Sequence, residues 1–241
     1  MLVNTKHRSD AAEIMDDFAM EGEILRDALD KLASINRLLG GNAVTISGLR
    51  WLLDRSNVKQ GKAIRILDVG CGNGDMLRVL ADYGLKKGLN MHLTGVDANA
   101  FTVAHAEALS LGYPSIKYRC ADIFEEIKQQ REYDVILCTL TLHHFKDPEL
   151  LELMGGLKKQ ATMGVVVNDL HRSKLAYYLF MLVCIVFGLN AMSRDDGLIS
   201  ILRGFKKKDL LYYTNKLNVR NYLLRWKWAF RYQWVISTDK E

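Results

Sequence analysis

The chain of 241 residues carries a formal net charge of +5 and is 49% hydrophobic and 25% charged. This length allows a sizeable core without covalent staples, and the sequence shows no internal repeat or low-complexity tract. Neither a disulfide scaffold nor a zinc site is indicated, because no C-x-x-C pair occurs among the cysteines, which are Cys71, Cys120, Cys138 and Cys184. The first ten residues lack the apolar run of a secretory signal. We therefore expect a cytoplasmic protein with one main domain.

Residues 1–42 are predicted to form a helical cap that precedes the main domain. Apolar side chains recur there at helical spacing before a stop at Gly40 and Gly41, and they are Ile24 or Leu25, Ala28, Leu29, Leu32, Ile35 and Leu39. Upstream of this helix, the acids Asp16 and Asp17 stand beside Phe18. Two interpretations stay open for this upstream segment: a solvated acidic turn, or part of a cover over a substrate pocket.

Residues 64–75 read IRILDVGCGNGD, which predicts a buried strand that runs into a glycine-rich turn. Glycine lets the backbone bend tightly and approach a ligand, and it leaves amide groups free at the start of the next helix. The spacing of Gly70, Gly72 and Gly74 differs from the dinucleotide fingerprint, because Asp75 takes the place of that fingerprint's third glycine. An acid at this place disfavours a pyrophosphate and suits a ligand with positive charge, such as an ammonium or a sulfonium.

Three more strands are predicted to follow, each ending in small or polar residues. Residues 91–96 end at Asp97, residues 116–120 lead to Ala121, Asp122 and Ile123, and residues 133–138 lead to the segment TLTLHHF. A carboxylate at the end of the second strand can accept the hydroxyls of a ribose, although Asp97 alone is also explained as a helix N-cap and Asp122 as a turn residue. Together these strand ends predict a doubly wound α/β sheet with its ligand at the carboxyl edge.

At this point residues 45–170 resemble the class I methyltransferases that depend on S-adenosylmethionine (SAM). The resemblance implies a Rossmann-like, mostly parallel seven-stranded sheet over residues 43–241, with a fifth strand at 164–168, a helix at 205–216 and a terminal antiparallel hairpin from segments 219–228 and 229–237. It implies that the glycines approach the methionine part of SAM, that Asp97 holds the ribose and that Asp122 with Ile123 frames the adenine. The implied SAM-binding residues are Asp68, Gly70, Cys71, Gly72, Gly74, Asp75, Asp97, Ala98, Ala121, Asp122, Ile123 and Thr139.

Residues 175–193 carry no charge within an expected helical insertion at 173–204. Their length approaches that of a membrane span, but a single crossing would separate the terminal hairpin from the sheet that it completes. Two interpretations remain, a helical lid over the active site or an interfacial element that dips into a membrane. Either implies an apolar acceptor, and side chains that would suit one are Tyr177, Tyr178, Met181 and Met192, although such residues are more often core.

The expected reaction is transfer of a methyl group to an apolar small molecule. A general base is needed only if the acceptor must lose a proton, as a phenol does. The candidates are His143, His144 and His171, with Arg172 to orient an acceptor oxygen, and no metal is predicted. The pair His143-His144 also occurs in methyltransferases of quinones and related molecules, where a structural role for one histidine is equally open. The sequence further resembles a bacterial subgroup associated with polyketide, pigment and lipid products, so we expect a phenolic, quinone-like or lipid acceptor.

Rival functions depend on the C-terminal half. Basic and aromatic residues interleave between residues 203 and 231, which favours RNA or an anionic membrane surface as alternative partners. The segment CTLTLHHF lacks the Asn/Asp-Pro-Pro motif of amino-directed nucleic-acid methyltransferases, and no pair of glutamates suits an arginine substrate. We therefore expect no nucleic acid partner, and a SAM-binding protein without catalysis is the remaining alternative. The sequence makes no prediction of oligomeric state.

Overall fold

The computed structural model describes residues 3–56, 62–129 and 131–238, and its centre is one seven-stranded sheet. The strand order is β3-β2-β1-β4-β5-β7-β6. The strands are β1 (Ile64–Val69), β2 (Met91–Asp97), β3 (Ile116–Cys120), β4 (Tyr133–Thr139), β5 (Ala161–Leu170), β6 (Tyr222–Lys227) and β7 (Arg231–Ser237). Every predicted strand is present, and the expected fold is confirmed.

Strands β1 to β5 are parallel to their neighbours, and β7 is antiparallel to both β5 and β6. The predicted terminal hairpin is therefore confirmed, with tighter limits than expected. Because β1 lies between β2 and β4, the chain reverses its winding direction at β1. In sheets of this kind a ligand binds outside the carboxyl ends of the strands at such a reversal.

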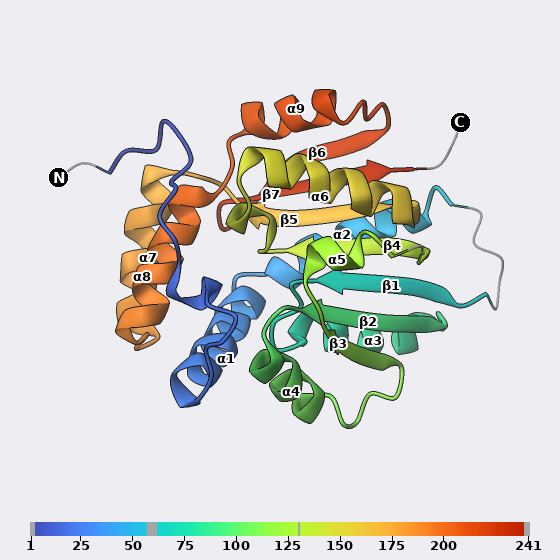
Figure 1. Ribbon diagram of the computed structural model, residues 1–241, viewed down its shortest axis with the longest axis horizontal. Helices are drawn as coiled ribbons and strands as arrows, with labels where there is room; N and C mark the ends of the chain where they lie inside the picture. Colours follow the sequence, from blue (N-terminus) through green and yellow to red (C-terminus); the bar gives the residue numbers. More distant parts are fainter. Residues whose placement is uncertain (1–2, 57–61, 130, 239–241) are drawn as a thin grey trace.

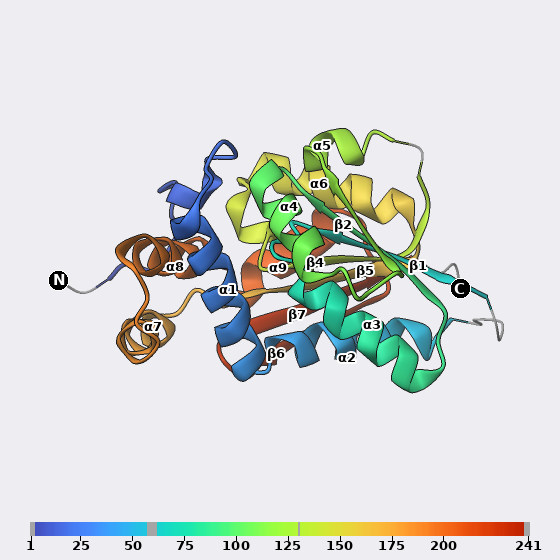
Figure 2. The same cartoon turned by 90° about the horizontal axis from the view of Figure 1, so that it is seen from below.

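Helices cover both faces of the sheet and bury two apolar clusters (Figure 2). Helix α2 (Gly41–Leu53) and helix α3 (Asp75–Lys87) bury Leu49 and Leu77 against one face. Helix α6 (Asp147–Gln160) and helix α9 (Lys207–Lys216) bury Leu153 and Tyr213 against the other face. Helix α4 (Ala100–Leu109) packs against β2 and β3, and a short helix α5 (Ile123–Glu126) follows β3. These layers hold the strand ends in fixed positions.

The remaining elements gather at the end of the sheet toward which β1 and β4 point (Figure 1). They are the 3-10 turn η1 (Ile14–Asp16), α1 (Glu23–Leu38), α7 (Lys174–Val186) and α8 (Ala191–Arg203). Helix α1 ends at Leu38, and Gly40 takes a left-handed conformation before α2 begins at Gly41. The proposed boundary between residues 42 and 43 therefore falls inside α2. Residues 1–2 of the predicted cap and 239–241 of the predicted domain lie outside the described residues.

The uncharged segment folds as a helical hairpin and not as one long helix. Ser173 caps α7 and Asn190 caps α8 through side-chain bonds to backbone N–H groups. No helix in the described part of the chain is long and apolar enough to cross a membrane. Helix α8 packs on α1, η1 and the turn after β4, as a lid would. Helix α7 packs mainly on α8, and it buries only Ala176 and Cys184.

Candidate active site

The glycine turn between β1 and α3 has the backbone that only glycine adopts without strain. Gly70, Gly72 and Gly74 have φ angles of 65°, 52° and 75°. A Cβ on Gly70 would lie 2.4 Å from Thr141 Cγ2, and one on Gly74 would lie 2.0 Å from the Tyr118 hydroxyl. At Gly72 the nearest atom to such a Cβ is Leu29 Cδ2 at 3.9 Å. The turn is therefore closed on two sides and open at its centre.

Asp97 at the end of β2 faces this turn. Its Oδ2 accepts a hydrogen bond from the Gly72 backbone N–H at 3.0 Å, and its Oδ1 accepts one from Asn99 N–H at 3.1 Å. The N-cap of α4 is Asn99, whose side chain accepts from Thr102 N–H. The alternative of Asp97 as that helix's N-cap is therefore wrong. The contact of Asp97 with a ribose stays a prediction.

Asp68 supplies a second carboxyl group beside the turn. It is buried, and its Oδ1 has no hydrogen-bond partner among the described residues. Burial and the neighbouring Asp97 raise the pKa of Asp68 to about 8. A buried carboxyl without a donor is stabilised by a ligand that brings positive charge or an N–H group. The two acids thus fit a ligand that carries an ammonium and a sulfonium.

Other predicted cofactor residues have protein partners. The buried Asp75 carboxylate accepts from Arg37 and, at 2.7 Å, from Asn42 Nδ2, and it joins α3 to the two preceding helices. Asp122 is exposed and accepts from Phe124 N–H at 2.7 Å as the N-cap of α5, which agrees with the turn alternative. The geometry therefore gives both acids structural contacts and leaves their proposed cofactor contacts as predictions.

The smaller predicted residues frame the same edge. Ala121 N–H donates to the Asp97 carbonyl, and the Ala98 carbonyl accepts from Cys120. Thr139 Oγ1 lies 3.1 Å from Thr45 Oγ1 of α2. Two further predicted residues lie nearby without a decisive contact: Cys71, whose pKa burial raises, and the half-buried Ile123. The four cysteines are free.

The segment after β4 is strained where it meets the site. Leu140 has a φ of 55°, and its N–H donates to the Asn168 carbonyl at 2.9 Å. A left-handed conformation is costly for a residue with a branched side chain, and such strain persists where the surroundings enforce it. The turn η2 (Leu142–His144) follows directly and directs the two histidines differently.

His144 is paired with a carboxylate of the N-terminal segment. Its Nδ1 lies 2.6 Å from Asp16 Oδ1. Because an ionised carboxylate only accepts hydrogen bonds, this contact requires the proton on Nδ1 and leaves the lone pair on Nε2. Burial raises the pKa of the Asp97 carboxyl, and the charge of His144 acts against that rise. The side chain is 28% exposed, so a substrate can reach it.

His143 is buried behind His144 and is held as a structural residue. Its Nδ1 donates to Asp169 Oδ1 at 2.8 Å, and its Nε2 lies 3.7 Å from Glu13 Oε1. Burial raises the pKa of the Glu13 carboxyl to about 7. The pair therefore consists of the half-buried His144 and the fully buried His143, and only His144 has the geometry of a base.

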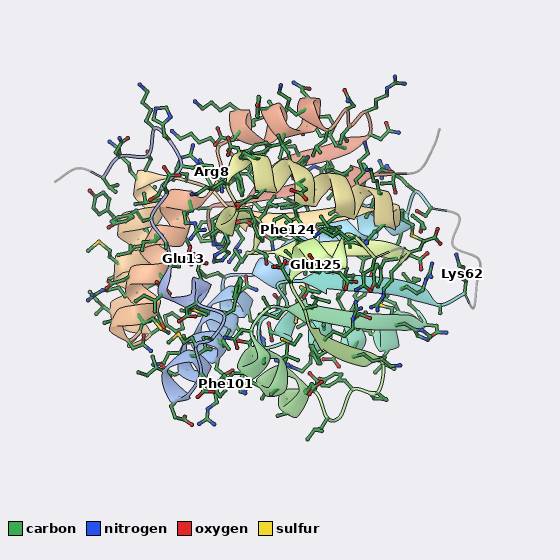
Figure 3. The ribbon with its side chains drawn as sticks, viewed as in Figure 1. Arg8, Glu13, Lys62, Phe101, Phe124 and Glu125 are labelled. Atoms are coloured by element: carbon green, nitrogen blue, oxygen red, sulfur yellow. The ribbon has the colours of Figure 1, made fainter. Side chains whose placement is uncertain are left out.

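Two arginines fasten the N-terminal segment over this turn. Arg203 donates from Nη1 to Asp16 Oδ2 at 2.6 Å and from Nε to the His143 carbonyl at 3.2 Å. Arg8 donates from Nη2 to the carbonyls of His143 and Phe145 at 2.9 and 2.8 Å. Figure 3 shows Arg8 and Glu13 along this segment, beside the strand ends. The sequence drew attention to Asp16 because it stands next to Asp17. No pattern in the sequence predicted that Glu13, Asp169 and Arg203 would contact the histidine pair.

The lone pair of the predicted base His171 already accepts a hydrogen bond from the protein. Trp226 Nε1 lies 3.2 Å from His171 Nδ1, and an indole N–H only donates, so the proton of the neutral ring is on Nε2. Burial, with Lys206 and Arg172, lowers the pKa of His171. The geometry therefore favours His144 over His171 as a base.

Arg172 donates from each of its three nitrogens to the protein. The acceptors are the Thr5 carbonyl at 3.2 Å, the Gly204 carbonyl, and Asp209 Oδ2 at 2.9 Å. These contacts tie the segment after β5 to the N-terminal segment and to α9. They favour a structural role for Arg172 over the predicted orientation of an acceptor.

The donor atoms of Glu13, His143 and His144 lie within 4.8 Å of one another, a spacing compatible with a metal ion. However, both histidines give Nδ1 to carboxylates, and Arg203 Nη1 lies 3.6 Å from Glu13 Oε1. The Nδ1 atoms of both histidines are therefore taken by carboxylates, whereas Glu13 Oε1 and His143 Nε2 have no hydrogen-bond partner among the described residues. The expectation that no metal takes part stays a prediction.

Comparison with known proteins agrees with this geometry. The family model described as a methyltransferase domain matches residues 60–174. Over this segment the chain is similar to methyltransferase domains. The resemblance inferred from the glycine turn and the strand ends is thereby confirmed, and the matched segment contains the glycine turn, Asp97 and His144.

The chain is similar to curated ubiquinone biosynthesis O-methyltransferases. It is 30% identical to the protein of Aeromonas salmonicida over 138 residues, which cover 56% of this chain and 54% of that protein. It is 35% identical to the protein of Coxiella burnetii over 92 residues, 36% of each chain. The chain therefore spans about half the length, or less, of these relatives.

Solved structures share the methyltransferase fold. The plantazolicin methyltransferase BamL, in complex with a substrate analog and SAH, has a TM-score of 0.65 and 13% identity, with 89% of this chain and 91% of that chain covered. The magnesium protoporphyrin IX methyltransferase of Synechocystis PCC 6803 with bound SAM has a TM-score of 0.55 and 13% identity, with 92% and 88% covered. At these identities the likeness concerns the fold alone.

Proposed function

We propose that this protein transfers a methyl group from SAM to a hydroxyl group of an apolar, phenolic or quinone-like acceptor. The observation that carries the proposal is the Asp16–His144 pair, which leaves an accessible imidazole nitrogen beside the cofactor edge. A phenol must lose its proton to become a good nucleophile, and an imidazole oriented by a carboxylate is suited to take it.

The residues of the glycine turn fit SAM. Asp97 would accept the ribose hydroxyls, the open backbone at Gly72 would lie against the methionine part, and Asp68 would face its positive charge. SAM supplies, when bound, an electrophilic methyl group on a sulfonium. These assignments are supported by the buried carboxyl of Asp68, which has no donor of its own.

The protein's own contribution is positioning and proton transfer. His144 Nε2 would take the hydroxyl proton while the oxygen forms its bond to the methyl carbon. The bond from that carbon to the sulfonium sulfur would break, with S-adenosylhomocysteine as the leaving group, and Asp16 would stabilise the resulting imidazolium. Alignment of the two reactants in a site covered by α8 and the N-terminal segment can supply up to roughly 7 to 11 kcal/mol of barrier reduction. Proton removal adds on the order of 10² to 10⁴-fold.

The relatives support oxygen as the methylated atom. Their names describe O-methylation in ubiquinone biosynthesis. The exposed apolar helix α7 beside the site supports an apolar acceptor.

Transfer of label from methyl-labelled SAM tests the proposal. The wild-type protein is offered catechols and phenols with and without an alkyl tail, and a bacterial extract separated into organic, RNA and protein fractions. We expect label in the organic fraction, its loss in His144→Ala and its retention in His171→Ala. Label confined to RNA would assign the basic hairpin to nucleic acid. SAM binding without label in any fraction or acceptor would favour the protein without catalysis.

We further propose that α7 lies on an anionic membrane surface. Its exposed apolar side chains include Leu175, Leu182 and Ile185, which are 58%, 57% and 78% exposed. Its one charged residue is Lys174. The neighbouring hairpin contributes exposed Trp226 and Trp228, next to basic residues at 225 and 227. Exposed apolar residues flanked by tryptophan and basic residues are typical of proteins that bind at the lipid interface.

Sedimentation with lipid vesicles tests this surface. The wild-type protein should bind vesicles that contain phosphatidylglycerol more strongly than vesicles of phosphatidylcholine alone. The double variant Leu182→Glu, Ile185→Glu should lose binding, while Leu111→Glu should keep it, because Leu111 is 89% exposed but lies outside α7. The membrane proposal is wrong if the wild-type protein does not bind vesicles and elutes as a dimer in size-exclusion chromatography while the double variant elutes as a monomer. In that case α7 contacts a second copy of the chain.

A further inference from the structure

Arg231, the first residue of β7, is a buried arginine without a protein acceptor. It is 4% exposed, and its Nε and Nη1 have no hydrogen-bond partner among the described residues. Arginine stays charged at neutral pH, and a buried charge is normally paired or hydrogen-bonded. Burial lowers the pKa of Arg231 to about 10, which reflects the cost of this position.

The surroundings of Arg231 supply cations and apolar groups. In the sheet register it lies between Leu170 of β5 and Lys227 of β6, and directly paired residues point to the same face. The carboxylate that acts on Arg231 through its charge is Asp169. Asp169 is the neighbour of Leu170 along β5, so its side chain points to the opposite face. Its oxygens already accept from His143 Nδ1 and Leu170 N–H.

The same position lies at the functional end of the sheet. Leu170 is the last residue of β5, so Arg231 is at the carboxyl edge where the acceptor must bind. Asn168, on the same face, also has a buried oxygen, Oδ1, without a partner. Buried polar atoms without a partner call for an explanation, and a bound polar group of a ligand would supply one.

Backbone strain fixes Arg231 at this edge. The turn before it contains Ala229 and Phe230 with φ angles of 59° and 54°. Hairpin turns with two such residues usually contain asparagine or glycine, so alanine and phenylalanine are costly there. The Phe230 carbonyl accepts from His171 N–H at 2.7 Å, which ties the turn to the end of β5. Figure 1 shows the start of β7 at the end of the sheet where α1, α7 and α8 gather.

We propose that Arg231 binds a carboxylate carried by the methyl acceptor, so that the preferred substrate is a phenol that also carries a carboxylate and not a neutral phenol. The planar guanidinium matches a carboxylate with two parallel hydrogen bonds. The carboxylate of the ligand neutralises the buried charge of Arg231. Because Asn168 Nδ2 already donates to the protein, Arg231 is the main donor to that carboxylate. This inference rests on the proposed function, because it names the acceptor of that site.

Binding of benzoate and of its neutral amide, benzamide, tests the inference without any methyl transfer. Calorimetry in the presence of saturating S-adenosylhomocysteine should show tighter binding of benzoate than of benzamide. Arg231→Met should weaken benzoate binding by roughly ten- to hundredfold, the range for a hydrogen bond to a charged group. Arg225→Met is the matched control, since Arg225 is an exposed arginine on the same face of the hairpin and its loss should leave benzoate binding unchanged.

A stability measurement separates a ligand anchor from a structural residue. The free Arg231→Met protein should unfold at a higher temperature than the wild type, because it no longer buries an unpaired charge. A lower unfolding temperature together with unchanged benzoate binding would overturn the inference, as would equal binding of benzoate and benzamide by the wild type. If the protein methylates neutral phenols but does not prefer benzoate to benzamide, the proposed function holds and the role of Arg231 is wrong. If it binds benzoate through Arg231 but transfers no methyl group, the role of Arg231 as a carboxylate anchor holds and the proposed function is wrong.

Discussion

The cofactor edge and the acceptor side of this domain are assembled in different ways. The cofactor edge uses Asp68, Gly72 and Asp97 from two neighbouring strand ends, and one backbone contact from Gly72 to Asp97 joins them. The acceptor side joins His144 to Asp16 across 128 residues and Arg203 to Asp16 across 187 residues. The first depends on local backbone geometry, and the second depends on the docking of a distant segment. Substitutions at the cofactor edge should therefore change mainly SAM affinity, and substitutions on the acceptor side should change mainly kcat.

Replacement of the proposed base should have the largest effect. His144→Ala should lower kcat by on the order of 10² to 10⁴-fold, because proton removal from the acceptor is lost. SAM affinity, measured by calorimetry, should change little. His171→Ala is the matched control, since the His171 lone pair is already occupied by Trp226. Equal losses of kcat in the two variants would remove the distinction between the histidines.

The cofactor edge was largely predictable from the sequence because its chemistry is local. Positive φ angles at Gly70, Gly72 and Gly74 require glycine, and this requirement leaves a visible spacing in the chain. The strand ends that carry Asp97 and Asp122 follow from the alternation of apolar segments and helices. What the spacing did not reveal is that Asp122 caps its own short helix, because a cap and a ligand contact favour the same residue type.

The acceptor side was predictable only in its residue types. The sequence indicated His143, His144 and His171, but it did not distinguish them, since the partners Asp169, Asp16 and Trp226 come from three separate segments. Arg172 was predicted to orient an acceptor oxygen, and Arg231 was not singled out for that role. Arg172 is buried against three acceptors, whereas Arg231 Nε and Nη1 have no partner in the described part of the chain. Such a difference depends on tertiary contacts that one sequence does not show.

Replacement at the cofactor edge should affect binding more than catalysis. Asp97→Ala should weaken SAM binding by roughly ten- to hundredfold, the range expected for hydrogen bonds to a charged group. Calorimetric titration with SAM measures this change, and circular dichroism checks that the fold is kept. Asp122→Ala should cost less, because that exposed side chain already bonds its own helix. SAM affinity that is unchanged in Asp97→Ala would remove the ribose assignment.

Two alanine substitutions within the glycine turn should separate two contributions to the loss of unfolding free energy: steric contact of the new Cβ, and the left-handed backbone conformation. Gly72→Ala should lose about 1 to 2 kcal/mol of unfolding free energy for a left-handed residue with a Cβ. Gly70→Ala should lose more, because its Cβ also meets Thr141 atoms at 2.4 and 2.5 Å. Urea unfolding measures both. The difference should shrink when Thr141 is also replaced by alanine, and a difference that persists would mean that Thr141 is not the obstacle.

The smallest expected effect is the pH dependence that Glu13 gives to the docking of the N-terminal segment. Burial raises the pKa of Glu13 from 4.5 to about 7, so the folded state holds a proton that the unfolded chain releases. The stability from this proton is fully present below pH 4.5 and is lost as the pH rises through about 7.

Glu13→Gln keeps the neutral form at every pH. Its unfolding free energy should therefore fall less than that of the wild type between about pH 5 and pH 8, by at most about 1.4 kcal/mol per pH unit for one proton. Glu21→Gln, an exposed acid of the same segment, should follow the wild type. Parallel curves for Glu13→Gln and the wild type would show that Glu13 is ionised in the folded protein. The distant contacts of the acceptor side would then be held by ion pairs at every pH, and pH would not loosen the segment that carries Asp16.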